Sequence, residues 1–271
     1  MKKKVLKLIA LLFPNLIVRK AYVHLTTPRQ VLIRPEEHKI REQAQKSVFK
    51  FNDFSIQLFQ WGNGEKKILL VHGWEGNAGN FSKLIPLLTR QGFTVLSFDG
   101  PSHGASSQGA TNMFQFIELV SVLVKKYSIK YLISHSFGSV ASLIALGQNP
   151  DLVIKKYIGI TVPNKFRDRI EEMNSWLGFP PIVAEKLIKK IETNHGIKVD
   201  DINVADFALK ANVEKALLLH DTNDRVLPVE KTIEVAKNWS VAKLEQVTGT
   251  GHFKILGVDK VTQRIIDFLE E

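Results

Sequence analysis

The chain has 271 residues, of which 44% are hydrophobic and 24% charged, and this composition excludes a disordered, collagen-like or coiled-coil protein. It contains no cysteine, which excludes disulfide bonds, a thiolate nucleophile, iron–sulfur clusters and sulfur-based zinc sites. The net charge is +10, but residues 1–50 carry 12 Lys and Arg against 3 Glu, and the remaining residues carry 25 against 24 acidic ones. Because the body of the chain is nearly neutral, we expect no nucleic acid among its partners.

Residues 1–46 are predicted to form a basic, amphipathic N-terminal arm. Within residues 1–25, lysines and arginines lie beside apolar side chains, and the longest unbroken apolar run is too short for the roughly 20 residues that span a bilayer. The basic residues are Lys2, Lys3, Lys4, Lys7, Arg19 and Lys20. The apolar ones are Val5, Leu6, Leu8, Ile9, Leu11, Leu12, Phe13, Leu16, Ile17 and Val18.

Three interpretations of this arm stay open on sequence alone. It packs on the body of the protein or on a second subunit, it is an uncleaved or poorly recognised export signal, or it lies in the interface of an anionic membrane. We expect a cytoplasmic protein, with peripheral membrane contact through residues 1–25 as one of these alternatives.

From residue 47 onward, strand and helix patterns alternate. Strands are predicted at 47–51, 54–61, 67–71, 93–98, 131–134, 153–161, 215–219 and 243–247. Helices are predicted at 80–91, 112–126, 138–147, 229–238 and 255–269. This alternation predicts an α/β protein with a mostly parallel, eight-stranded sheet and helices on both faces, opened by an antiparallel hairpin. We assign the core to residues 47–162 and 211–271 and a charged, helical insertion to residues 163–210.

Small, polar and titratable residues follow five of the predicted strands. They lie at positions 72–76, 99–106, 134–138, 220–224 and 248–252. In a parallel sheet, ligands bind beyond the carboxyl ends of the strands. The sequence therefore predicts a functional site at that edge of the sheet.

Residues 134–138 read Ser-His-Ser-Phe-Gly, between an apolar strand and a helix rich in small residues. This is typical of a nucleophile elbow, in which a serine occupies a sharp strand-to-helix turn. The usual pattern is G-x-S-x-G, and Ser134 stands here at the first glycine position. The candidate nucleophile is Ser136.

An activated serine requires a base within hydrogen-bonding reach and an acid that orients the base. His252 follows the last strand in a glycine-flanked loop, and Asp224 follows the preceding strand, which gives the order Ser, Asp, His expected on such a sheet. Asp221 is an alternative acid, or it caps the turn; we favour Asp224.

Three motifs resemble the α/β-hydrolase superfamily over about residues 47–271. They are His72-Gly73 after the third strand, Asp99 to Ser106 after the fourth, with Ser102 in place of the first glycine, and Asp224 to Pro228 around the acid. The resemblance implies the α/β-hydrolase fold with residues 163–210 as a small helical cap. It also implies an oxyanion hole made by the backbone N–H groups of Trp74 and Phe137. Asp221 stands where the family commonly has glycine.

Together these features predict a serine hydrolase that cleaves a carboxylic ester or thioester of a small-molecule acyl substrate, without a cofactor or metal. The alternative is a non-catalytic protein of this fold that binds a small molecule or a partner. The histidines at 72, 103, 135 and 220 lie near the same rim but lack metal-ligand spacing. Several cap side chains line an acyl pocket or pack the cap onto the body: Phe166, Trp176, Leu177, Phe179 and Phe207.

Overall fold

The computed structural model describes residues 2–271, with side chains from residue 6 onward, so the predicted basic side chains of residues 2–4 and the apolar one of residue 5 lie outside the described residues. The chain divides into two compact units. The cap unit comprises Met1–Thr27 and Lys165–Asn203, and the sheet unit comprises Pro28–Asn164 and Val204–Glu271. Residues 28–46 and 204–210, assigned from sequence to the arm and the cap, group with the sheet unit.

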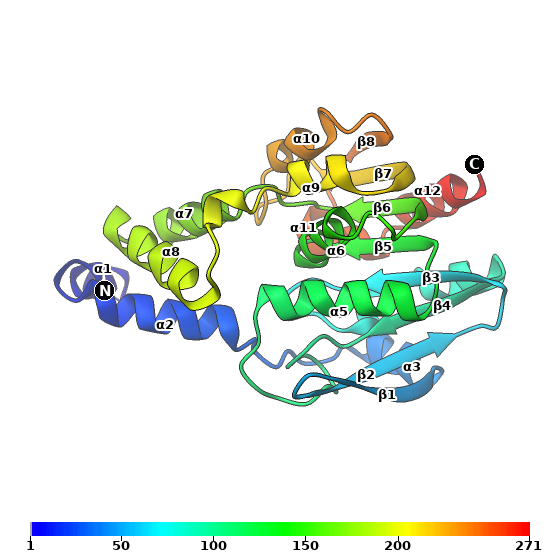
Figure 1. Cartoon of the computed structure of the whole chain (residues 1–271), viewed down its shortest axis with the longest axis horizontal. Helices are drawn as coiled ribbons and strands as arrows, with labels where there is room; N and C mark the ends of the chain where they lie inside the picture. Colours follow the sequence, from blue (N-terminus) through cyan, green and yellow to red (C-terminus); the bar gives the residue numbers. More distant parts are fainter. Residues whose placement is uncertain (1) are drawn as a thin grey trace. The chain divides into compact units, whose positions relative to one another are not determined.

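The sheet unit contains an eight-stranded sheet in the order β1-β2-β4-β3-β5-β6-β7-β8 (Figure 1). The first two strands form an antiparallel hairpin, β2 is antiparallel to β4, and all remaining neighbours are parallel. The strands are β1 (Gln45–Phe51), β2 (Phe54–Trp61), β3 (Lys66–Val71), β4 (Phe93–Phe98), β5 (Tyr131–His135), β6 (Ile154–Ile160), β7 (Val213–Asp221) and β8 (Ala242–Val247). The predicted fold class and the strand count are confirmed.

Helices cover both faces of this sheet, and α5 and α6 lie side by side on one of them (Figure 1). The helices of the sheet unit are α3 (Pro35–Glu42), α4 (Ile85–Arg90), α5 (Met113–Lys126), α6 (Phe137–Gln148), α9 (Val204–Lys210), α10 (Val229–Ala236), α11 (Gly251–Lys254) and α12 (Asp259–Glu270). Two 3₁₀ turns, η1 (Ala78–Phe81) and η3 (Ile255–Gly257), complete the unit.

Two helices predicted as continuous are interrupted. The predicted helix 80–91 is the turn η1 followed by α4, which has Pro86 in its first turn, where the missing N–H of proline costs no helical hydrogen bond. The predicted helix 255–269 begins only at Asp259, after η3. Both predictions of an unbroken helix are therefore wrong at their N-terminal ends.

The core of the sheet unit follows from the strand pattern. Alternate side chains of a strand point to opposite faces, so Ile68 and Leu70 of β3 lie in one apolar cluster with Leu88 of α4 and Ile265 of α12. Strand β4 is buried at every position, as expected of a parallel strand covered on both faces. This packing fixes the carboxyl ends of β3, β5 and β7 at one edge of the sheet.

The cap unit consists of α1 (Lys2–Leu12), α2 (Pro14–Thr26), α7 (Phe166–Leu177), α8 (Pro181–His195) and the 3₁₀ turn η2 (Val199–Asp201). Its core joins the N-terminal helices to the insertion, because Ala10, Ile17 and Val18 pack in one cluster with Val183 and Leu187 of α8. Within the described residues, no single helix is long and apolar enough to cross a membrane; residues Leu6–Leu12 and Pro14–Thr26 reach that length and hydropathy only as a pair bent by 113°.

Candidate active site

Ser136 occupies a sharp turn between β5 and α6. Its backbone has φ 52° and ψ −120°, a conformation that costs an L-residue about 1 to 3 kcal/mol and is held by the surrounding packing. The Ser136 N–H donates to the carbonyl of Ile160 on the neighbouring strand, at 2.9 Å. A Cβ atom at Gly138 would lie 2.5 Å from the carbonyl oxygens of Val71 and His72. Only glycine therefore allows α6 to approach β3 this closely.

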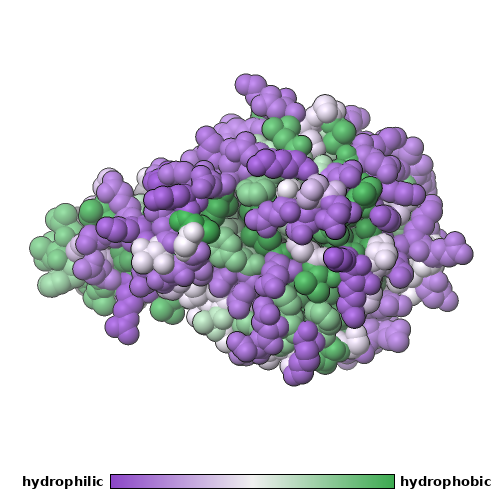
Figure 2. Space-filling view, in the orientation of Figure 1, coloured by the Kyte–Doolittle hydropathy of each residue, from purple (hydrophilic) through white to green (hydrophobic). Residues whose placement is uncertain are grey.

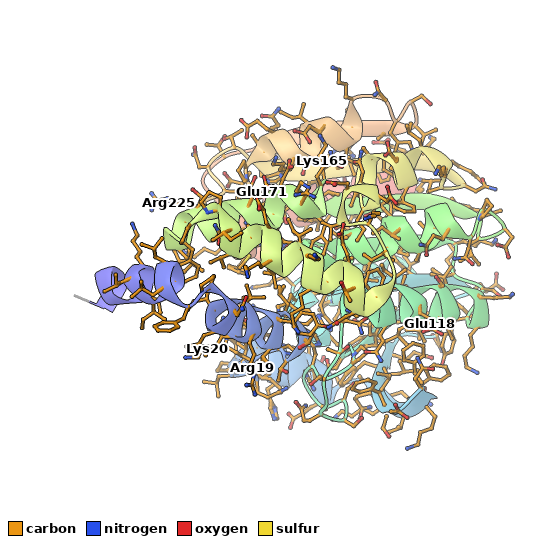
Figure 3. The ribbon with its side chains drawn as sticks, turned by 60° about the vertical axis from the view of Figure 1, so that its left-hand side comes forward. Arg19, Lys20, Glu118, Lys165, Glu171 and Arg225 are labelled. Atoms are coloured by element: carbon orange, nitrogen blue, oxygen red, sulfur yellow. The ribbon has the colours of Figure 1, made fainter. Side chains whose placement is uncertain are left out.

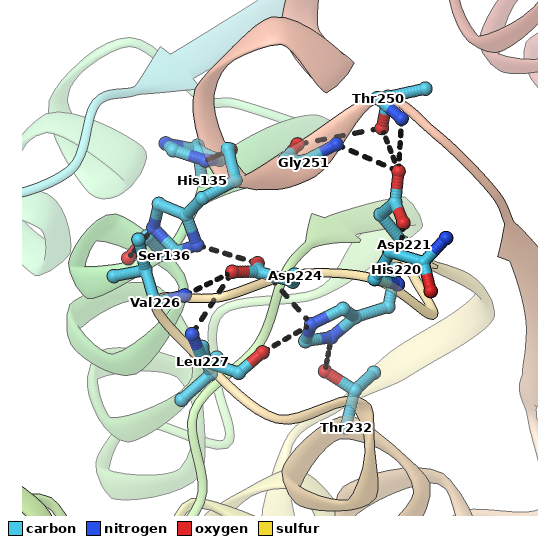
Figure 4. Close-up of polar contacts among 12 residues, drawn as sticks. His135, Ser136, His220, Asp221, Asp224, Val226, Leu227, Thr232, Thr250 and Gly251 are labelled. Atoms are coloured by element: carbon cyan, nitrogen blue, oxygen red, sulfur yellow. Dashed lines mark hydrogen bonds and ion pairs between the residues drawn. The ribbon is translucent and has the colours of Figure 1, made fainter.

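The structure brings Ser136, His252 and Asp224 into one chain of hydrogen bonds (Figure 4). His252 Nε2 lies 3.0 Å from Ser136 Oγ, and His252 Nδ1 lies 2.7 Å from Asp224 Oδ2. The carboxylate is an acceptor only, so Nδ1 carries a hydrogen and Nε2 is free to accept the serine proton.

The Asp224 carboxylate is fully buried, and hydrogen-bond donors of the protein surround it in place of water. Its other oxygen accepts the backbone N–H groups of Val226 and Leu227 at 2.7 and 3.0 Å. Burial acts to raise the pKa of Asp224, but the hydrogen bonds from His220, His252 and the backbone outweigh it and hold the pKa well below its ordinary value. The acid therefore remains ionised beside the imidazole.

Asp221, the alternative acid, holds the loop that carries the histidine (Figure 4). Its carboxylate accepts the Gly251 N–H at 2.7 Å, the Thr250 hydroxyl at 2.7 Å, the Asn223 N–H at 2.7 Å and also the Thr250 N–H. Burial opposes ionisation, yet these donors lower the pKa of Asp221 to about 2. Asp221 thus fixes Thr250 and Gly251, directly before His252.

The segment after β3 lies against the nucleophile turn. A Cβ at Gly73 would sit 3.4 Å from Ser136 Cβ, and the rings of Trp74 and Phe137 meet edge to face with centroids 5.2 Å apart. The two residues predicted to supply oxyanion-hole N–H groups are thus neighbours beside Ser136.

His72 organises this segment as a neutral imidazole. Its Nε2 accepts the Gly100 N–H at 2.9 Å, so Nδ1 carries the hydrogen and donates to the Gly73 carbonyl at 2.7 Å. Burial lowers the pKa of His72 to about 4. The side chain therefore ties the ends of β3 and β4 together beside the site.

Two further histidines, which the sequence predicted only to lie near the rim, contact the hydrogen-bonded chain. His135 Nε2 donates to the His252 carbonyl at 2.9 Å, and burial lowers the pKa of His135 to about 3. His220 Nε2 faces the Leu227 carbonyl at 3.0 Å and Asp224 Oδ2 at 3.5 Å. The position of each, at the last residues of β5 and β7, is the signal that pointed to them.

The aromatic residues suggested for an acyl pocket occupy several environments. Phe166 and Phe179 pack against the core of the cap unit, and the Trp176 side chain is largely exposed. Phe207 belongs to α9 of the sheet unit, where its backbone lies against Gly147. Among the described residues, no group of three or more His, Asp or Glu side chains is arranged to hold a metal ion.

Comparison with known proteins agrees with this architecture. The family model for the alpha/beta hydrolase fold matches residues 66–198. An esterase from Pyrococcus furiosus superposes with a TM-score of 0.65 at 18% identity, covering 91% of this chain and 97% of that one. A thioesterase domain from the curacin biosynthetic pathway superposes with a TM-score of 0.62 at 14% identity, over 84% of this chain and 99% of the domain. The chain has the α/β-hydrolase fold, as the sequence motifs predicted.

Curated relatives carry serine hydrolase names. A Drosophila melanogaster protein named "Probable serine hydrolase" is 34% identical over 116 residues, which is 40% of this chain and 34% of that protein. A human "Serine hydrolase-like protein" is 32% identical over 102 residues, 35% of this chain and 50% of the relative. The matched segment thus spans about a third to a half of these relatives. Within that segment, the chain is similar to proteins that carry serine hydrolase names.

Proposed function

We propose that this protein hydrolyses a carboxylic ester or thioester through a covalent acyl-enzyme on Ser136. The observation that carries the proposal is the continuous hydrogen-bonded chain from Ser136 Oγ through His252 to Asp224. This arrangement supplies a nucleophile, a base of the correct tautomer and an ionised acid that stabilises the imidazolium.

In the first half-reaction, Ser136 Oγ attacks the acyl carbonyl carbon while His252 Nε2 takes its proton. The carbonyl π electrons move to oxygen, and the N–H groups of Trp74 and Phe137 are the donors that we assign to the resulting oxyanion. Phe137 is the first residue of α6, so the positive end of that helix favours the same negative charge. Collapse of the intermediate expels the alcohol or thiol, which receives the proton from His252.

In the second half-reaction, water attacks the acyl-serine. His252 removes the water proton and returns it to Ser136 Oγ as the acid product leaves. Asp224 keeps its charge throughout, because its hydrogen bonds stabilise the carboxylate and not the acid.

The test compares Ser136→Ala with a matched control, Ser240→Ala, which replaces an exposed serine. We expect Ser136→Ala to abolish turnover of p-nitrophenyl esters and acyl thioesters and to abolish fluorophosphonate labelling, with an unchanged melting temperature. Ser240→Ala should retain both activities. Undiminished labelling of Ser136→Ala, or no labelling of the wild-type protein, would contradict the proposal and favour a non-catalytic binding protein.

A further inference from the structure

The N-terminal helices have two apolar faces, and only one of them is covered. The covered face contributes Ala10, Ile17 and Val18 to the core of the cap unit, with exposures of 6% or less. The uncovered face, called here the docking face, carries the exposed apolar side chains of both helices and of the bend between them. They are Leu6, Leu8, Leu11, Leu12, Phe13, Leu16 and Val23.

The docking face is apolar to an extent unusual for a folded surface. Leu11, Leu12 and Phe13, at the bend between α1 and α2, have exposed fractions of 64%, 60% and 62%. Figure 2 shows a hydrophobic patch at the place where Figure 1 draws α1. Contiguous exposed apolar side chains of this kind mark contact surfaces, because leaving them in water is unfavourable.

Positive charge is concentrated on the same helices. Residues 1–27 contain six Lys and Arg and no Asp or Glu, whereas residues 165–203 of the same unit contain seven of each sign. Arg19 and Lys20 are exposed on α2 (Figure 3). Their spacing from Leu16 and Val23, which are also exposed, places all four on one side of the helix. Apolar and basic side chains therefore share one surface.

The combination of apolar and basic side chains indicates what kind of partner the docking face binds. A second copy of the chain would bring its own Arg19 and Lys20 against those of the first, which opposes pairing through this face. An anionic bilayer accepts both features at once, since leucine and phenylalanine enter the acyl boundary while lysine and arginine meet the lipid phosphates. The 113° bend between the helices fits a segment lying along a surface.

We propose that the docking face binds the surface of anionic phospholipid membranes and attaches the cap unit to them. The N-terminal helices thereby serve two purposes, completing the cap core with one face and holding lipid with the other. This inference does not depend on the catalytic assignment, because binding requires no turnover.

The test measures co-sedimentation of the full chain with vesicles of phosphatidylglycerol and phosphatidylcholine, and with phosphatidylcholine vesicles alone. The docking variant replaces Leu11, Leu12 and Phe13 by Ser; Ser at position 13 is also a good N-cap for α2. A matched control replaces the three exposed apolar residues Val31, Leu32 and Leu209 of the sheet unit by Ser.

We expect wild type and control to sediment with the anionic vesicles, and binding of the docking variant to be weaker by about tenfold or more. Arg19→Gln with Lys20→Gln should weaken binding by about tenfold at low salt, and high salt should release the wild type. Because the two charge substitutions lie outside the covered core, they test the proposal even if the docking variant unfolds.

Three results would overturn the proposal. They are wild-type protein that stays in the supernatant, equal binding to neutral and anionic vesicles, and a folded docking variant that binds like wild type. A concentration-dependent dimer in analytical ultracentrifugation that the docking variant abolishes, without vesicle binding, would instead assign the face to a second copy.

Discussion

Replacing Asp221 by Ala tests whether this carboxylate positions the catalytic loop. The substitution removes an acceptor of four hydrogen bonds, from Asn223, Gly251 and both donors of Thr250. A buried hydrogen bond to a charged group contributes about 1.5 to 3 kcal/mol to stability. Because these donors are only partly buried, we assign about 1 kcal/mol to each hydrogen bond. We therefore expect Asp221→Ala to lower the free energy of unfolding by about 4 kcal/mol.

The same substitution should lower kcat/KM for ester hydrolysis by about ten- to a hundredfold, because His252 Nε2 loses its fixed distance from Ser136 Oγ. Asp221→Asn keeps one oxygen for the donors and should have the smaller effect on both quantities. Urea denaturation and p-nitrophenyl ester kinetics measure them, with Asp53→Ala at the exposed β1–β2 turn as control. Activity of Asp221→Ala within twofold of wild type would refute the positioning role.

A pH series and further substitutions test the protonation and the packing of the site. Because burial lowers the pKa of His72 to about 4 and of His135 to about 3, the unfolded chain takes up protons below about pH 6.5 that the folded protein does not. Urea denaturation should therefore show stability falling by about 1.4 kcal/mol per pH unit for each of these histidines between pH 6.5 and 4; a flat profile would contradict their neutral burial. Gly138→Ala should abolish folding or turnover because its Cβ meets two carbonyl oxygens at 2.5 Å, whereas Gly257→Ala, with its nearest contact at 3.6 Å, should melt and turn over like wild type. His220→Phe should lower kcat about tenfold with KM unchanged in steady-state kinetics, and a change confined to KM would remove His220 from the support of the acid.

The strands of the sheet unit were predictable because burial on both faces leaves a clear signal in sequence. Strand β3 was expected at 67–71 and extends over Lys66–Val71, and β4 was expected at its observed bounds of Phe93–Phe98. The break between η1 and α4 was not predicted, because apolar periodicity continues through Pro86. Periodicity shows which face of a segment is buried and is less informative about where one helix stops and the next begins.

The packing of the N-terminal helices could not be predicted from the sequence, for a different reason. Ile17 and Val18 read as part of a long apolar stretch, and their partners Val183 and Leu187 are more than 160 residues away along the chain. Such pairing is decided by tertiary packing, which local patterns do not encode. The same holds for His135, whose hydrogen bond to the His252 carbonyl joins the end of β5 to α11, two segments that only the fold brings together.

The departure from the usual elbow pattern at Ser134 has a physical compensation in its surroundings. Glycine is favoured there because space is limited, yet the Ser134 hydroxyl is accommodated by hydrogen bonds to Tyr157 Oη at 2.7 Å and Ser139 Oγ at 3.1 Å. Burial raises the pKa of Tyr157, so its hydroxyl stays protonated and needs a partner. Because an unpartnered buried hydroxyl costs about 1 to 3 kcal/mol, the serine at the glycine position and the tyrosine on β6 stabilise each other. In the five-residue motif alone, Ser134 is a departure from glycine. In the folded protein, its hydrogen bonds to Tyr157 and Ser139 make serine compatible with the elbow.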